Sequence, residues 1–127
     1  MKYVEIHNWK EYEKKKEWLK AIELLQDEIA YNLVVVHNMY SDVKYNENSD
    51  REIVYIHRFY GHDSNKKIIE KMKKIYKFSL EFGLWRIEYE RCLENEEGLY
   101  DEKDQIFCLE NTVKLKKLLI GILRSIK

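Results

Sequence analysis

The chain has 127 residues, the size of one ordinary domain, and its 23 basic and 23 acidic side chains leave no net field to draw it to nucleic acid or an anionic membrane. Hydrophobic residues make up 45% of the sequence and charged residues 36%, a composition that excludes a disordered chain. Two cysteines are too few for a disulfide framework, and no run of about 18 apolar residues occurs, so we expect a reduced, cytoplasmic protein that does not span a membrane.

The first half of the sequence predicts a helix followed by a β-hairpin. Asn8 and Glu11 have the spacing of a capping box, and apolar residues then recur at three- and four-residue steps, which predicts a helix over about 9 to 30. The short β-branched run at 33–36 is matched by a second run at 53–56 across a polar gap. These two runs are typical of paired strands.

The second half predicts the same order of elements. Asp63 or Ser64 would cap a helix that Gly83 ends. Its buried stripe would consist of Ile68, Met72, Ile75, Tyr76, Ser79 and Leu80. The alternation of apolar and charged residues over 85–93 then predicts a strand with one solvated face, with 106–109 as its partner.

A closing helix completes the predicted fold. Asn111 or Thr112 would begin this helix, whose apolar stripe would be Leu115, Leu118, Leu119, Ile122 and Ile126. The predicted class is therefore α+β, an antiparallel sheet of about four strands packed with three amphipathic helices in the order α-β-β-α-β-β-α. We expect a single domain over 1–127, in which two degenerate helix-hairpin units (about 8–60 and 64–110) precede the closing helix.

The segment 55–63, "YIHRFYGHD", raises the question of an active site. In the predicted hairpin His37 would lie opposite His57 if paired residue numbers sum to 94, and two imidazoles on one face serve general acid–base chemistry or bind a metal. A shift of one residue in the pairing separates them. The candidate catalytic set is His37, His57, Arg58 and His62, with Lys66 as an alternative phosphate contact.

Two basic segments suggest other ligands. Residues 66–77 carry six lysines and one glutamate, and residues 113–127 are basic and apolar with no acid. The first could follow a nucleic-acid backbone and the second could lie on a membrane. We interpret them instead as a solvated helix face and a core helix, and expect neither nucleic-acid nor membrane binding.

The acidic segment around the second predicted hairpin indicates a protein partner. Residues 88–104 carry eight acids against Arg91 and Lys103. Repulsion among them is relieved when a basic surface approaches, and an apolar pair within an acidic rim is typical of a small binding hot spot. The predicted partner-binding residues are Glu94, Glu96, Glu97, Leu99, Tyr100, Asp101 and Glu102.

Three functional hypotheses follow. The first is a small binding or inhibitory module of the immunity, antitoxin or anti-defence type that docks a basic protein surface through the acidic hairpin, without a cofactor or metal. The alternatives are a histidine- or metal-dependent phosphodiester hydrolase, and an oligomeric structural protein in which the basic and acidic segments meet across subunits.

Overall fold

The computed structural model describes residues 2–40, 66–94 and 101–125. In this part of the chain there are four helices and no strand. They are α1 (Trp9–Lys14), α2 (Trp18–Tyr40), α4 (Lys66–Glu94) and α5 (Glu102–Arg124). The predicted α+β class with its four-stranded sheet is therefore wrong, because the described chain is α-helical.

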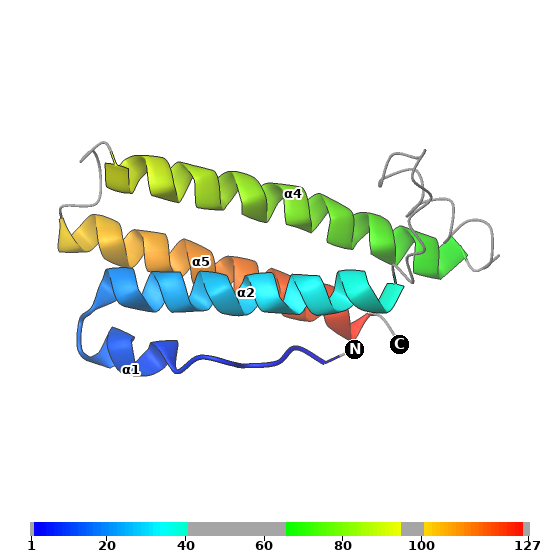
Figure 1. The fold of residues 1–127 in the computed structure, drawn as a ribbon, viewed down its shortest axis with the longest axis horizontal. Helices are drawn as coiled ribbons and strands as arrows, with labels where there is room; N and C mark the ends of the chain where they lie inside the picture. The colour runs from blue at the N-terminus through cyan, green and yellow to red at the C-terminus, as the bar shows by residue number, and fades with distance from the viewer. Residues whose placement is uncertain (1, 41–65, 95–100, 126–127) are drawn as a thin grey trace.

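The three long helices lie side by side (Figure 1). Helices α2 and α5 run in the same direction and α4 runs in the opposite direction. The short helix α1 and the extended segment before it lie along α2, so that the start of this segment lies near the end of α5. Buried apolar residues from all four helices form one core.

The strand predicted at 33–36 lies within α2. Leu33 and Val36 are buried on the same side as Ile29, three and four residues apart, while Val34 is exposed. Burial against the other helices outweighs the weak preference of valine for strands.

The strand predicted over 85–93 belongs to α4, and Gly83 lies inside that helix instead of ending it. Phe78, Phe82 and Tyr89 are buried toward the core, whereas Ile87 is 64% exposed. Helix α4 thus carries apolar residues on two different sides. Along the sequence, the apolar residues of the two sides alternate with charged residues as they would in a strand with one solvated face. The prediction of a strand was wrong for this reason.

The second predicted strand, 106–109, and the cap predicted at Asn111 or Thr112 both lie inside α5. This helix begins at Glu102, after Asp101 at its N-cap position. Thr112 is buried, and its hydroxyl donates to the carbonyl of Cys108 at 2.9 Å, as a threonine within a helix does.

The helix predicted over 9–30 is interrupted between α1 and α2. Lys16 has a φ of 61°. The amide of Glu17 donates to the carbonyl of Tyr12 at 2.9 Å, and the amide of Lys16 donates to the backbone carbonyl of Glu13 at 3.0 Å. These bonds form a Schellman motif, which usually has glycine at the left-handed position. Asn8 precedes α1 without a side-chain cap bond, so the predicted capping box is absent.

The segment before α1 is held against the bundle by side chains of α2. We call residues 2–8 the N-terminal strap. The Asn32 amide pairs with the backbone of Val4 in both directions, accepting from its N–H at 2.8 Å and donating to its carbonyl at 2.9 Å. Side chains of α2 therefore satisfy backbone groups of the strap in the way that a neighbouring strand would.

Candidate interaction surface

Among the described residues, several buried polar side chains meet where the N-terminal strap lies against α2 and α5. The Glu28 carboxylate is fully buried, and it accepts from the Tyr3 hydroxyl at 2.6 Å and the Ile6 amide at 3.0 Å. The buried ammonium of Lys116 lies 3.4 Å from Glu28 and 3.1 Å from Glu5. The same ammonium lies 5.3 Å from the ring centroid of Trp9.

These polar groups form a structural centre. Burial and the bond to Glu28 raise the pKa of the Tyr3 hydroxyl, so it remains a proton donor, and Lys116 lowers the pKa of Glu5 through a hydrogen bond and its charge. Every charge in the group has a partner, which is the condition for burying an ion pair without a large penalty. The centre joins the strap, α2 and α5. Its polar atoms bond to one another, which gives them a structural role.

The predicted histidine site loses its geometric basis. His37 lies on α2, so the cross-strand pairing that placed it opposite His57 does not apply. The Nε2 atom of His37 lies 3.0 Å from the Ser79 hydroxyl of α4, and burial lowers the pKa of the imidazole. His57, Arg58 and His62 are outside the described residues. Within the described residues no three His, Cys, Asp or Glu side chains are grouped to hold a metal ion.

The predicted acidic surface is described only in part. Glu94 ends α4, Asp101 occupies the N-cap position of α5 and Glu102 begins α5; all three are exposed. Glu96, Glu97, Leu99 and Tyr100 lie outside the described residues. Acids at the start of a helix are stabilised by its dipole, so Asp101 and Glu102 also have a local structural reason to be there.

Two further sequence features carry no site. Burial, with a smaller effect from Cys92, raises the pKa of the Cys108 thiol to about 11, which makes it a poor nucleophile. None of the described helices has both the length and the apolarity to cross a membrane.

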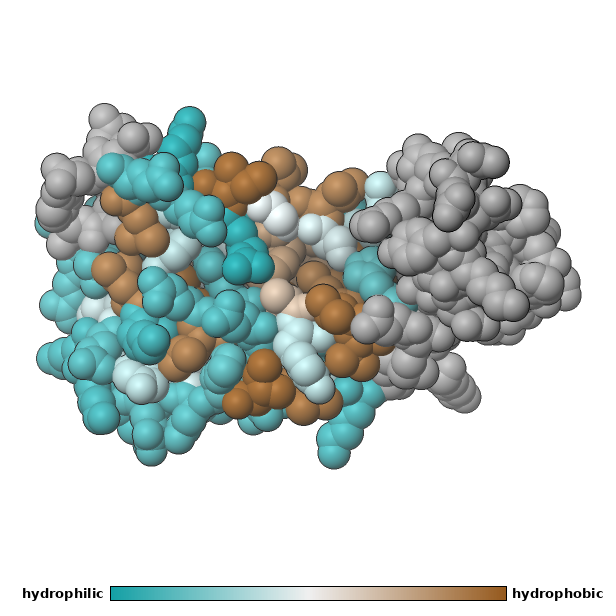
Figure 2. All heavy atoms as spheres, in the orientation of Figure 1, coloured by the Kyte–Doolittle hydropathy of each residue, from teal (hydrophilic) through white to brown (hydrophobic). Residues whose placement is uncertain are grey.

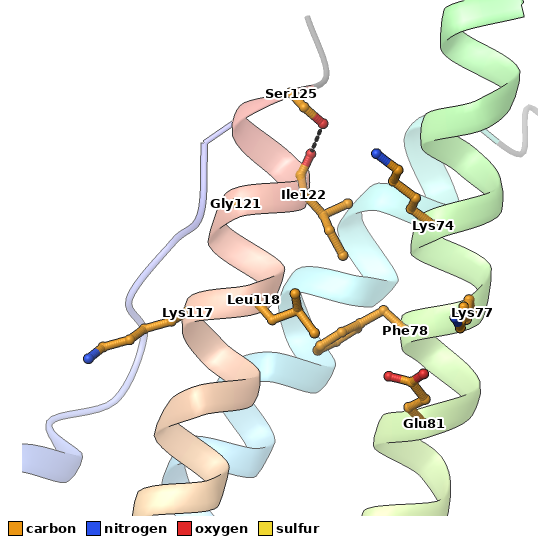
Figure 3. Close-up of a pocket in the computed structure, with 9 residues that line it drawn as sticks. All are labelled: Lys74, Lys77, Phe78, Glu81, Lys117, Leu118, Gly121, Ile122 and Ser125. Carbon is orange, nitrogen blue, oxygen red and sulfur yellow. Dashed lines mark hydrogen bonds between the residues drawn. The ribbon is translucent and has the colours of Figure 1, made fainter.

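An open groove between α4 and α5, with a volume of about 630 Å³, is lined by Phe78, Leu118 and Ile122 and by three lysines, Lys74, Lys77 and Lys117. Figure 3 shows Lys117 directed away from Phe78, whereas Lys74 extends toward the opposite helix. The ammonium groups do not converge on one point, and Glu81 shares the rim. The groove therefore lacks the arrangement of an anion site.

The feature that stands out is a stripe of large apolar residues on the outer side of α4. Leu80 is 55% exposed, Leu84 67% and Ile87 64%, and their spacing of four and three residues places them on one side of the helix. We call these three residues the α4 stripe. Phe78, Phe82 and Tyr89 fill the core on the other side, and the stripe residues do not belong to that core.

Helix α2 extends this apolar area. The His37–Ser79 contact at 3.0 Å and the Arg86–Asp27 contact at 4.0 Å join α2 to α4 in antiparallel order. Tyr31 and Val34 are exposed and follow Asp27 by four and seven residues, which places them on the same side of α2 as Asp27, at the level of the α4 stripe. In Figure 2, apolar atoms run along the upper edge of the visible face and into its middle, where α4 and α2 adjoin. We call this area, the α4 stripe with Tyr31 and Val34, the α2–α4 face.

The charges at the two ends of the α4 stripe have opposite signs. On the N-terminal side, Lys73, Lys74 and Lys77 are exposed, with no acid among residues 73–77. On the C-terminal side, residues 88–94 carry three exposed glutamates and Arg91, whose guanidinium lies 2.8 Å from its own neighbour Glu88. Because one end of this surface is basic and the other acidic, a charged partner helix is favoured in one orientation and disfavoured in the reverse one.

The sequence contains a signal for this surface, although the predicted elements place Leu80 in a core stripe and Ile87 in a strand. Read as one continuous helix, positions from 73 to 94 follow alternating steps of four and three residues through Leu80, Leu84 and Ile87, the spacing of a helix–helix seam.

In comparisons with protein-family models, curated proteins and solved structures, no match to this chain was found.

Proposed function

We propose that this chain is a protein-binding module whose α2–α4 face receives an amphipathic helix of its partner. The observation that carries the proposal is the α4 stripe: three large aliphatic side chains, each more than half exposed, in helical spacing on one side of a helix whose other side already forms the core. An exposed apolar row flanked by charges is the usual composition of a helix-binding surface.

The charge pattern specifies the partner helix. An antiparallel partner needs an apolar stripe, acids opposite the lysines of residues 73–77 and basic residues opposite the glutamates of residues 88–94. A helix with this chemistry would bury the α4 stripe and pair both charged ends. A uniformly charged partner would pair one end and be repelled by the other.

A capture experiment with matched variants tests this function. Immobilised wild-type chain, Leu84→Lys and Phe107→Lys are exposed to an extract of the native host, and the bound segment of each captured protein is then titrated as a peptide. Phe107 is 63% exposed on α5, so Phe107→Lys also replaces an exposed apolar side chain with lysine, but on another surface. We expect Leu84→Lys to weaken binding about 30-fold, as for a hot spot of about 2 kcal/mol, and Phe107→Lys to leave it unchanged.

The bound segment must also be an amphipathic helix with the opposite charge order. A partner whose affinity is the same for wild type and Leu84→Lys would refute the proposal. Neither substitution should unfold the chain, because exposed positions usually change stability by less than about 0.5 kcal/mol.

A second candidate function is binding to a basic protein surface, which the sequence predicts as the partner of the acidic segment. It is supported by Glu94, Asp101 and Glu102, which are exposed where α4 ends and α5 begins. An inhibitor of the immunity, antitoxin or anti-defence type would use such an end. In the same capture experiment, a Glu94→Lys and Glu102→Lys double variant that loses the partner, while Leu84→Lys keeps it, would favour this candidate.

A further inference from the structure

We infer that the helix bound by the α2–α4 face is α4 of a second copy of this chain, packed antiparallel about a two-fold axis that passes beside Leu84. The inference rests on the proposed function, since it names the partner for that face. It follows from the symmetry of α4 itself, in the order of its apolar residues and in the order of its charges.

The outer side of α4 carries a continuous row of seven exposed positions at alternating steps of four and three residues. The row consists of Lys73, Lys77, Leu80, Leu84, Ile87, Arg91 and Glu94. Leu84 is its middle member, with one aliphatic residue on either side. Such spacing keeps a row facing a partner helix over several turns.

A two-fold axis beside Leu84 makes this row complementary to itself. Leu84 would pack on Leu84 of the second copy, and Leu80 would pack on its Ile87, so the three apolar layers are filled without a gap. At the ends of the row, Lys73 would face Glu94 of the second copy. A parallel arrangement would instead place Lys73 on Lys73 and Glu94 on Glu94.

The wider charge distribution favours the same antiparallel order. The three lysines of residues 73–77 would lie against residues 88–94, whose three glutamates and one arginine have a net charge of −2. Lys77 would approach Arg91 of the second copy, a repulsion lessened because Glu88 lies 2.8 Å from that arginine and Glu90 lies one residue away. Opposite net charges thus meet twice in the dimer, once on each side of the axis.

Two further residues of α2 and one glycine fit this arrangement. Tyr31 and Val34 of each copy would border the paired α4 helices. Gly83 lies next to the axis, half-buried, and a Cβ built there would have no atom within 4 Å. The single chain does not need a glycine at this position, whereas a glycine lets two backbones approach closely.

Sedimentation of the purified full chain over micromolar to millimolar concentrations tests the inference first. We expect a reversible monomer–dimer equilibrium, weakened at least 30-fold by Leu84→Lys and unchanged by Phe107→Lys. A chain that remains monomeric over this range overturns the inference. The proposed function is then judged separately, by whether a captured partner helix still depends on Leu84.

A charge exchange tests the antiparallel order. Lys73→Glu makes the layer that residue 73 shares with residue 94 of the second copy acidic on both helices, and Glu94→Lys makes it basic on both, so each single variant should weaken its own dimer about 10-fold at low salt. The double variant, Lys73→Glu with Glu94→Lys, exchanges the two charges and should recover wild-type dimerisation. Mixing the two single variants should give a heterodimer. Dimerisation that ignores the single changes, or is not recovered in the double variant, overturns the proposed pairing.

Discussion

At the scale of single residues, the buried centre formed by Glu28, Lys116 and Asn32 determines how the N-terminal strap is attached. Glu28 and Asn32 lie on the same side of α2 as Leu25, and Lys116 lies on the same side of α5 as Leu119. Placing polar residues within apolar stripes is costly unless they meet one another. Here the Glu28 carboxylate and the Lys116 ammonium lie 3.4 Å apart, so the pairing of α2 with α5 is specified by charge as well as by shape.

Breaking this pair from one side should be more harmful than replacing both partners. Lys116→Met leaves the fully buried Glu28 carboxylate without its cation, and we expect a loss of about 3–5 kcal/mol in the free energy of unfolding. Adding Glu28→Gln to Lys116→Met should recover a large part of this loss. Urea unfolding measures both, with Lys117→Met, an exposed neighbour, as the control. Equal losses in the single and double variants would show that packing alone is responsible.

At the scale of elements, α4 is the helix with two functions. Its inner side contributes Phe78, Phe82 and Tyr89 to the core, and its outer side presents the α4 stripe. A helix that is apolar on two opposed sides leaves one of them in water unless a partner covers it, and an exposed apolar patch marks an interaction site. This is why the same helix appears in the fold and in both proposals.

Gly83 offers a direct measurement on this element. In the interior of a helix glycine is about 1 kcal/mol less favourable than alanine, and an added Cβ would have no atom within 4 Å. We therefore expect Gly83→Ala to raise the free energy of unfolding by about 1 kcal/mol, measured in the Leu84→Lys background so that self-association does not contribute. A destabilised variant would mean that α4 bends or packs differently at this position.

At the scale of the whole molecule, the described helices share one core, and acid should weaken the structure. Burial lowers the pKa of His37 from its ordinary value of 6.5, and Lys116 lowers the pKa of Glu5 from 4.5. As the pH falls, each group is therefore protonated in the unfolded chain at a higher pH than in the folded chain. The stability of the folded chain is thus complete above each ordinary pKa and falls as the pH drops below it.

Urea unfolding at pH 8, 6, 5 and 4 should therefore show a stability that decreases in two stages, beginning near pH 6.5 for His37 and near pH 4.5 for Glu5. His37→Gln should remove the first stage, because glutamine does not titrate. His7→Gln, at an exposed histidine of the strap, is the matched control and should keep it. A stability that rises between pH 6.5 and 5 would contradict the described burial of His37 beside Ser79.

Local patterns in the sequence were sufficient for several features of this protein. They predicted helices around Ile22, Ile75 and Leu119, all of which are buried in helices, and they predicted a chain with enough apolar material for a core. The opposite charges of residues 66–77 and 88–104 were also evident. These properties depend on spacing and composition along the chain, which the sequence displays directly.

Where the sequence fits both a helix and a strand, only the tertiary structure decided between them. Residues 33–36, 85–93 and 106–109 have the composition of strands, yet all are helical, because helix packing buries Leu33, Tyr89 and Leu109 and leaves Ile87 outside. The partnership of Glu28 with Lys116 likewise joins residues far apart in the chain. Burial and pairing of this kind depend on distances in space, and those distances arise only when α2, α4 and α5 come together.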